Sequence, residues 1–466
     1  MDAFRDDLDW SFKAVHPLKI VIAGAGIGGL AAAVGLKKAG HDVVMVEQSR
    51  EIGEVGAGIQ MAPNATRIMR RLGLLETMMQ KADVLDKISI RRWEDNSQLG
   101  TAPVGVAVEE RYHAPMCVIH RGDLQAILLQ AVKDLNVPIR LGCKVVAADA
   151  SFSARVQLAS GEWLSGDVVI CADGIKSAIR RQMAGHYGVK DEPCPTGDAA
   201  YRVLIPKEKL KNDQTALKML SQNIAIRWMG SGGHIMAYPI RHNTLYNIVL
   251  IHPEKPSQAA EESWTSKGDK NEMLDTYRAW NDTFKGLLEF VPDGEIMEWT
   301  LNTHLPLPSW TVNKCVLLGD ACHPMLPYVA QGAAQAIEDA SVLTTALSLI
   351  SSPSEIETAL QVYELVRKDR AEKIQNSAAS TGKALHLPDG EEQRRRDDAI
   401  RASMKDANER DPDMWVDRQW QDFMWGVDVM KECVEGWDAL VAKVGEHALG
   451  PLRPETSEIS SPQPEP

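Results

Sequence analysis

The sequence predicts a mixed α/β protein in which a dinucleotide-binding unit of the Rossmann type carries an inserted antiparallel sheet. Three observations predict this fold class. A buried strand, a glycine-rich turn, a helix and a second strand follow one another in residues 19–48. A second strand-to-helix junction lies at residues 315–334. Between these segments, residues 201–251 form short strands with hairpin connections, which is typical of an antiparallel meander.

The first unit contains glycines at G-x-G-x-x-G spacing, directly after an apolar strand over residues 20–23. Gly24 permits a tight turn, Gly26 lets a pyrophosphate approach the backbone, and Gly29 lets the helix pack closely on the strand. The helix N-terminus offers free N–H groups to an anion. Glu47 ends the second strand, where a carboxylate accepts hydrogen bonds from a ribose. An acid at this place suits FAD or NAD better than NADP, and the motif does not choose between these two.

A flexible glycine loop and a charged residue at a strand end follow this unit. Gly58 in the loop allows the backbone to lie against a flat ligand. Asn64 is a candidate N-cap for a helix over residues 65–73. Arg121 lies where another strand becomes a helix, a common place for a ligand contact in α/β sheets. The pattern alone fits an exposed surface charge at Arg121 equally well.

A further turn follows the buried strand DVVICADG. Asp173 and Gly174 form the turn, and a helix is expected directly after it. Ser177 and Arg180 lie three residues apart, so we expect them on one face of that helix.

Two polar residues interrupt otherwise apolar strands of the predicted meander. Arg202 lies in the strand YRVLIP and Tyr238 in the strand HIMAYPI. The two-residue period of a strand places Tyr238 on one face with His234 and Met236. The segment GSGGH opens no helix, so we interpret it as a hairpin turn and not as a second dinucleotide site.

The second strand-to-helix junction has the same arrangement as the first. The strand CVLLG ends at Asp320, whose carboxylate can bind a sugar or ribityl hydroxyl, and a proline-rich loop follows. The next helix begins at the small residues Gly332, Ala333 and Ala334, which would let a planar ligand approach its N-terminus.

The rest of the chain is predicted to be largely helical. We expect helices over residues 276–291 and 360–385 and a polar connection over residues 388–413. A Trp-rich helical segment follows over residues 415–440, whose aromatic rings we expect to pack and not to form a ligand cage. Residues 451–466 are rich in Pro, Ser and Glu and are predicted to be disordered.

Composition excludes several classes of protein. The chain has 466 residues, enough for two or three domains. Its formal net charge of −13 argues against nucleic acid or an anionic membrane as partner. The uncharged run over residues 20–36 is too short and too rich in glycine for a transmembrane segment. The seven cysteines form no C-x-x-C pair, so we expect no disulfide framework and no metal site. The acidic start lacks a signal peptide's pattern, so we expect a soluble, cytoplasmic protein.

Three segments, in this order and at these separations, carry a family resemblance: Gly24, Gly26 and Gly29 with Glu47; Asp173, Gly174 and Ser177 with Arg180; Gly319, Asp320 and Ala321 with His323 and Pro324. Together they resemble the group A flavoprotein monooxygenases, the single-component FAD aromatic hydroxylases, over about residues 18–385. Four segments look most like the salicylate hydroxylase branch and its fungal relatives: AYRVLIP, GGHIMAYPIR, LYNIVLI and HPMLPYVAQGAAQAIEDA. The Trp-rich end is also similar to that branch, though less specifically.

The resemblance implies one non-covalent FAD per chain. The three glycines of the first unit would hold its pyrophosphate, and Glu47 would bind the adenosine ribose. Gly58 and Arg121 would flank the flavin side of the cofactor. Asp320 would bind the ribityl chain, and Ala333 would lie beside the flavin ring.

The resemblance also implies the reaction. NADH or NADPH would reduce FAD, and Asp173 would serve both FAD and this transient nucleotide. A flavin C4a-hydroperoxide, formed with O2, would then place one oxygen atom on a small phenolic substrate, a salicylate-like acid among the candidates.

Arg202 and Tyr238 are the predicted catalytic residues. A phenolate reacts with an electrophilic oxygen far better than a phenol, whose pKa is near 10. Arg202 is cationic and could hold a phenolate or carboxylate, and the hydroxyl of Tyr238 could bond the reacting oxygen and relay its proton. Related tailoring enzymes use an Arg and a Tyr in such roles. The competing interpretation makes Arg202 a surface charge and Tyr238 a core aromatic, with His234 or His323 as the next candidates.

The predicted domain organisation follows the same scheme: an FAD-binding domain over 18–87, 116–190 and 300–385; a substrate domain over 88–115 and 191–299; a helical C-terminal segment over 386–450; and the tail over 451–466. The protein is expected to be a monomer or a homodimer.

Other functions stay open on the sequence. The first alternative is a tailoring FAD monooxygenase of fungal secondary metabolism, which would perform hydroxylation, epoxidation or oxidative dearomatisation. An NAD-dependent dehydrogenase and a catalytically idle flavin-binding module are further alternatives. Tryptophan halogenases share the first glycine motif, but their W-x-W-x-I-P segment is absent here.

Overall fold

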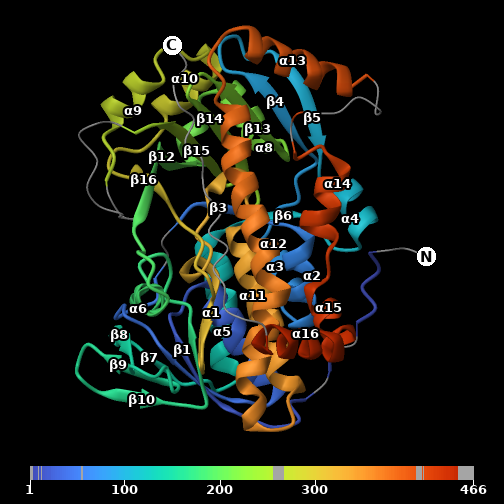
Figure 1. The fold of residues 1–466 in the computed structure, drawn as a ribbon. Coiled ribbons are helices and arrows are strands. Elements are labelled where there is room, and N and C mark those ends of the chain that lie inside the picture. The colour runs from blue at the N-terminus through green and yellow to red at the C-terminus, as the bar shows by residue number, and fades with distance from the viewer. Residues whose placement is uncertain are drawn as a thin grey trace, which may run out of the picture.

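The computed structural model describes residues 4–449 except residues 9, 12, 54–55, 255–266, 406–411 and 413. A sheet with parallel strands lies in the lower half of Figure 1, and a larger, mostly antiparallel sheet lies in the upper half. The long helix α12 (Ile356–Leu385) runs along both halves. The tail over residues 451–466, predicted to be disordered, lies outside the described residues.

The first sheet has six strands in the order β17-β18-β11-β1-β2-β7. Its strands pair in parallel except for β17 with β18, and β1, β11 and β18 are almost wholly buried, as expected for a sheet covered on both faces. The strands are β1 (Lys19–Ala23), β2 (Asp42–Val46), β7 (Ile139–Arg140), β11 (Val168–Cys171), β17 (Thr311–Val312) and β18 (Cys315–Leu317). Helices that pack around it include α1 (Ile27–Ala39), α5 (Arg121–Asp134) and α11 (Gly332–Leu349).

The second sheet has seven strands in the order β16-β12-β15-β14-β13-β4-β5. All neighbours are antiparallel except β13 with β4. The strands are β4 (Lys87–Arg92), β5 (Gln98–Pro103), β12 (Pro193–Pro206), β13 (Ile224–Gly230), β14 (Gly233–Ile240), β15 (Leu245–Pro253) and β16 (Met297–His304). Because these strands interrupt those of the first sheet along the chain, the predicted architecture of a split parallel unit with an inserted sheet is confirmed.

The two faces of the second sheet meet different partners. One face, with Trp228 and Tyr246, packs on the helices α7 (Lys207–Leu210), α8 (Gln214–Ser221), α9 (Lys270–Thr276) and α10 (Asp282–Glu289). The other face, with Tyr238 and Trp299, packs toward α12 and the C-terminal segment. Alternate residues of each strand therefore enter different environments.

Shorter elements complete the fold: β3 (Gly58–Met61), α2 (Pro63–Arg71), α3 (Leu75–Met79), α4 (Val106–Tyr112), β6 (Cys117–His120), β8 (Val145–Ala148), β9 (Arg155–Leu158), β10 (Trp163–Ser165), α6 (Ala178–His186), and the 3₁₀ turns η1 (Gly319–Ala321), η2 (Pro327–Val329) and η3 (Pro353–Glu355).

The single helix predicted over residues 276–291 is wrong. Helix α9 ends at Thr276 and α10 begins at Asp282. Asn281 caps α10, because its side-chain oxygen accepts a hydrogen bond from the backbone N–H of Phe284 at 3.0 Å. A good N-cap in the middle of a helical pattern starts a new helix there.

The polar connection predicted over residues 388–413 is also wrong in part, because it contains the helix α13 (Glu391–Ser403). This helix packs on the edge of the second sheet. Asp397 pairs with Arg92 of β4 at 2.9 Å, and Ile400 lies against Gly100 of β5. Only one apolar side chain of the helix is buried, so its hydrophobic pattern was too weak to reveal it.

Two predicted helix starts are shifted. Helix α2 begins at Pro63 after the N-cap Ala62, so Asn64 lies inside the first turn and is not the cap. Ser177 is the N-cap of α6 and not part of that helix. Its hydroxyl accepts a hydrogen bond from the backbone N–H of Arg180 at 3.0 Å, so the two residues do touch.

The Trp-rich C-terminal segment packs against the core. It contains α14 (Arg418–Gln421), the π-helical turn η4 (Asp422–Gly426), α15 (Val429–Glu435) and α16 (Trp437–Leu449). Trp415 and Trp425 are buried, with ring centroids 5.7 Å apart. The expectation that these aromatics pack together is confirmed for this pair. Within the described part of the chain, no helix is long and apolar enough to cross a membrane.

A buried charge network joins α11 to α12. Arg367 of α12 donates from Nε to Asp339 at 2.8 Å, and Arg370 donates to Glu338 at 2.8 Å. Arg370 also donates to the carbonyl oxygen of Met424 at 2.8 Å, which ties in the C-terminal segment. Burial by itself raises the pKa of Glu338, but the two arginines hold it below its ordinary value. The network therefore stays ionised inside the protein.

We expect Arg367→Met to destabilise the fold strongly, because it leaves Glu338 and Asp339 buried with one cation fewer. Removing one partner of a buried ion pair costs about 3–5 kcal/mol. Urea unfolding followed by circular dichroism measures the loss. Arg395→Met is the matched control, because Arg395 forms an exposed pair with Glu391 on α13 and such pairs contribute up to about 1 kcal/mol. Equal losses in both variants would contradict the structural role of the network.

Candidate active site

The glycine turn between β1 and α1 is shaped by close backbone contacts. Gly24 has a φ of +105°, and a Cβ there would lie 2.3 Å from the carbonyl oxygen of Ala172. A Cβ on Gly29 would lie 2.2 Å from the carbonyl oxygen of Gly24. Both positions thus require glycine for packing within the protein itself.

Gly26 is different, because among the described residues, apart from its two chain neighbours, no atom lies within 4 Å of a Cβ built there. It is the N-cap of α1, which has no side-chain cap and no acidic residue in its first turn. The free N–H groups and positive end of this helix therefore face open space, as an anion site requires. This geometry fits a pyrophosphate at Gly26.

Glu47 follows β2 and lies beside this turn. One of its carboxylate oxygens accepts a hydrogen bond from the backbone N–H of Ala25 at 2.7 Å, and the other accepts from Ser49 at 2.8 Å. These bonds fix the carboxylate next to the anion site. Each oxygen keeps a further lone pair that a ribose hydroxyl can use.

Gly58 and Arg121 come together through the pairing of β3 with β6. Gly58 pairs with His120, and the backbone N–H of Arg121 donates to the carbonyl oxygen of Ala57 at 3.0 Å. Burial lowers the pKa of Arg121, and the nearby carboxylate of Asp320 opposes this shift. Three of the predicted cofactor segments follow β1, β11 and β18 and thus meet at the carboxyl end of the parallel sheet. The fourth segment follows β6 and lies beside them.

Two half-buried carboxylates lie at this edge. Burial raises the pKa of Asp320, although His323 and Arg121 partly offset the effect. Burial also raises the pKa of Asp173, and within the described residues its Oδ1 atom is buried without a hydrogen-bond partner. A buried acceptor of this kind is costly unless a ligand hydroxyl donates to it. These residues therefore fit a nucleotide cofactor.

The N-terminus of α11 offers a second positive helix end. Ala333 is half-buried in the first turn, which has no side-chain cap and no acidic residue. Next to it, Gln331 Oε1 accepts from Asn64 at 3.1 Å and from Gln335 at 3.0 Å. These bonds turn Gln331 Nε2 away, where it is buried with no partner in the described part of the chain. The small residues and the free donor fit a flat, polar ligand edge.

Arg202 and Tyr238 lie on one face of the second sheet. Arg202 of β12 pairs with Val249, which also pairs with Met236 of β14, and Tyr238 lies two residues further along β14. Burial raises the pKa of Tyr238 above its ordinary value, and Arg202 lowers it in part, so the two groups interact. A Cβ on Gly58 would lie 3.0 Å from the Tyr238 hydroxyl oxygen. The structure thus brings both predicted catalytic residues to the side where Gly58 lies.

Arg202 is a half-buried cation that lies over an aromatic ring. Its guanidinium carbon is 4.4 Å from the centroid of the Trp299 ring. Burial lowers the pKa of Arg202 to about 10, so it remains charged at neutral pH. Its Nε atom is buried and has no hydrogen-bond partner among the residues that the structure describes. Arg202 is thus not the surface charge of the competing interpretation.

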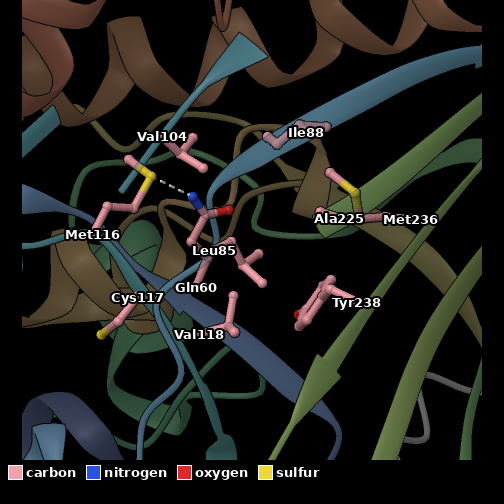
Figure 2. Close-up of a pocket in the computed structure, with 10 residues that line it drawn as sticks. All are labelled: Gln60, Leu85, Ile88, Val104, Met116, Cys117, Val118, Ala225, Met236 and Tyr238. Atoms are coloured by element: carbon pink, nitrogen blue, oxygen red, sulfur yellow. Dashed lines mark hydrogen bonds between the residues drawn. The ribbon is translucent and has the colours of Figure 1, made fainter. Parts of the chain in front are cut away.

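A cavity opens beside Tyr238 between β3, β6 and the second sheet (Figure 2). Its empty space, counted with its open mouth, is about 320 Å³, and little of that space is wide enough for a water molecule. Gln60 and Met116 lie on one side, joined by a hydrogen bond of 2.8 Å, and Met236 and Tyr238 lie on the other. The lining is mostly apolar: Gln60, Leu85, Ile88, Val104, Met116, Cys117, Val118, Ala225, Met236 and Tyr238. Such walls suit an aromatic ring.

His234 and His323, the next catalytic candidates from the sequence, are not among the residues that line the cavity. His234 Nδ1 lies 2.7 Å from Nε2 of His386. His323 Nε2 lies 2.6 Å from Asp339, whose carboxylate also accepts from the backbone N–H of Gly319 at 2.9 Å. Cys322, His323 and Asp339 lie close enough together to hold a metal ion. However, Asp339 already accepts hydrogen bonds from His323, Gly319 and Arg367. The trio is therefore a hydrogen-bonded cluster of the core.

Sequence reasoning missed three residues of this region: Gln60, Asn247 and Trp299. Gln60 and Trp299 resemble ordinary strand residues, so no signal marked them. Asn247 did carry a signal, because it is a polar residue inside the apolar strand LYNIVLI, just as Arg202 and Tyr238 interrupt theirs.

Comparison with known proteins agrees with this geometry. The model of a family described as FAD binding domain matches residues 17–378. The FAD-dependent monooxygenase atnJ of Arthrinium sp is 38% identical over 83% of this chain and 89% of the relative. The 3-amino-4-hydroxybenzoate 2-monooxygenase of Streptomyces platensis is 33% identical over 86% and 96%, respectively. A solved salicylate hydroxylase substrate complex has a TM-score of 0.73 and 26% identity, with 91% of this chain and 98% of that chain covered.

We expect Gly26→Val to fold normally and to lose its bound flavin. The added side chain enters space that is open among the described residues but that a pyrophosphate needs. Visible absorbance of the purified protein measures flavin content, and circular dichroism checks the fold. Gly185→Val is the control, since Gly185 near the end of α6 also has open space around its Cβ and lies far along the chain from this turn. Normal flavin content in Gly26→Val would overturn the assignment.

Proposed function

Because the chain belongs to the family of FAD-dependent monooxygenases, we propose that it hydroxylates a phenolic ring that it binds as an anion. FAD, once reduced by NADH or NADPH, supplies the activated oxygen atom from O2. The single observation that carries the substrate proposal is Arg202, a half-buried cation on the same sheet face as Tyr238, whose buried Nε atom has no hydrogen-bond partner among the described residues.

The cofactor would be held by the residues at the edge of the parallel sheet. The N-terminus of α1 at Gly26 suits the pyrophosphate, and Glu47 suits the ribose. Asp173 and Asp320 offer half-buried carboxylates to hydroxyl groups. The full proposed set is Gly24, Gly26, Gly29, Glu47, Gly58, Arg121, Asp173, Asp320 and Ala333.

Arg202 favours the ionised form of a bound phenol. A cation within about 4–6 Å stabilises a phenolate and lowers its pKa from near 10 toward neutral pH. Trp299 holds the guanidinium in place by a cation–π contact and leaves its N–H groups for the ligand. An electron-rich phenolate accepts an oxygen atom more readily than the neutral phenol, so this contact promotes the reaction.

Tyr238 acts as a hydrogen-bond donor to the reacting oxygen. Because burial raises the pKa of Tyr238, its hydroxyl keeps its proton at neutral pH. A protonated Tyr238 donates to a phenolate and orients the ring in the cavity. The mostly apolar cavity walls exclude water from the site and limit unproductive loss of the activated oxygen.

A second candidate is the oxidation of a larger fungal metabolite, by hydroxylation, epoxidation or oxidative dearomatisation. The higher identity to a fungal monooxygenase, 38% against 33% for the hydroxybenzoate enzyme, favours it. Both candidates use the same cofactor site and differ in the size of the substrate.

We expect phenols that ionise readily to stimulate NADH or NADPH oxidation and to gain one oxygen atom. The assay presents salicylates, hydroxybenzoates, and polycyclic and prenylated phenols to the FAD-loaded protein in air, with product mass as the readout. The O-methyl ether of each active phenol is the matched control, because it cannot form a phenolate. Equal conversion of phenol and ether would contradict reaction through a phenolate, and turnover of only the larger phenols would favour the second candidate.

We expect Arg202→Gln and Tyr238→Phe to uncouple the reaction. Without the cation or the donor, the substrate is poorly ionised or poorly oriented, so product per NADH falls while peroxide is released. The ratio of product to NADH consumed, and the peroxide released, are measured between pH 6 and 9 on variants with full FAD content. Tyr277→Phe is the control, since Tyr277 is buried on the opposite face of the sheet, where its hydroxyl donates to Ile251. Unchanged product yield in both site variants would exclude these roles.

A further inference from the structure

Asn247 lies in β15, between the strands that carry the two proposed catalytic residues. It pairs with Tyr238 of β14 on one side and with Leu204 of β12 on the other. Its side chain is fully buried, on the sheet face that also carries Arg202.

The orientation of the Asn247 amide is fixed by one hydrogen bond. The backbone N–H of Gly58 donates to Asn247 Oδ1 at 2.7 Å. Only the amide oxygen can accept this bond, so the NH₂ group must point elsewhere. In the described part of the chain, Asn247 Nδ2 is buried and has no hydrogen-bond partner. A buried donor without a partner destabilises a folded protein, so such a donor indicates a missing partner.

The amide of Asn247 and the hydroxyl of Tyr238 flank the same point. A Cβ on Gly58 would lie 3.0 Å from Asn247 Cγ and 3.0 Å from the Tyr238 hydroxyl oxygen. Three polar groups with unused hydrogen-bonding capacity thus share this region of one sheet face: the guanidinium of Arg202, the hydroxyl of Tyr238 and the amide of Asn247. All three can donate to an anionic oxygen.

We propose that Asn247 orients the substrate, with Nδ2 as a hydrogen-bond donor to its anionic oxygen and Oδ1 as the anchor that holds Gly58. The proposal rests on the proposed function, since it needs a substrate bound as an anion. Because one amide contacts both the substrate oxygen and Gly58, Asn247 sets the position of the aromatic ring relative to the flavin side of the site.

The test separates the two ends of the amide. Asn247→Asp keeps an oxygen for the N–H of Gly58 but replaces the donor by a negative charge, whereas Asn247→Leu removes both functions. In Asn247→Asp we expect full FAD content, at least a tenfold rise in KM for the active phenol, and a higher pKa of the bound phenol in an absorbance titration. In Asn247→Leu we expect the same losses and weaker FAD binding. Asn243→Asp, in the turn between β14 and β15, is the control for charge.

The outcomes distinguish the role of Asn247 from the proposed function, which is binding of the substrate as an anion. If Arg202→Gln loses binding and raises the phenol's pKa while Asn247→Asp behaves as wild type, Asn247 is only a brace for Gly58 and this inference is wrong. If the wild-type protein binds no phenol as an anion, the proposed function fails, and the role of Asn247 fails with it. A parallel effect of Arg202→Gln and Asn247→Asp, absent from Asn243→Asp, supports both.

Discussion

The buried ion network between α11 and α12 is the interaction on which the rest of the site depends. Glu338 and Asp339 follow each other on α11, so they point to different neighbours. Glu338 reaches Asn64 of α2 at 2.6 Å as well as the arginines, and Asp339 accepts from the backbone of Gly319 at the end of β18. One pair of acids thereby fixes α2, α12 and the strand end beside Asp320 relative to the first turn of α11.

His323 joins this network through its contact with Asp339. Burial lowers its pKa, but Cys322 and Asp339 raise it well above the ordinary value, so the imidazole is charged. Burial raises the pKa of Asp339, and His323 and Arg367 hold it below the ordinary value. Each ion is costly alone and stable only with its partners. The network therefore specifies one arrangement of the helices, which keeps the N-terminus of α11 pointed at the cofactor side.

Side chains alternate between the two faces along each strand of the second sheet, so the two faces lie in different environments. One face builds a helix-covered core around Trp228 and Tyr246, which gives the sheet its rigidity. The other face presents Arg202, Tyr238 and Asn247, and several of their hydrogen-bonding groups have no partner in the described structure. Buried polar atoms without a partner are costly, so a ligand bound on this face would gain by pairing with Arg202 Nε and Asn247 Nδ2.

The sequence by itself determined the features that depend on neighbours along the chain. The glycine turn, Glu47, Asp320 and the start of α11 at Gly332 all follow from local backbone needs and strand-to-helix order. It did not reveal α13, because that helix is held by Arg92 and not by an apolar stripe of its own. It also marked Arg202 and Tyr238 only as polar residues in apolar strands. Tertiary structure alone decided that they share a face with Asn247 and that Gly58 meets both Tyr238 and Asn247, since strand pairing across distant segments sets these contacts.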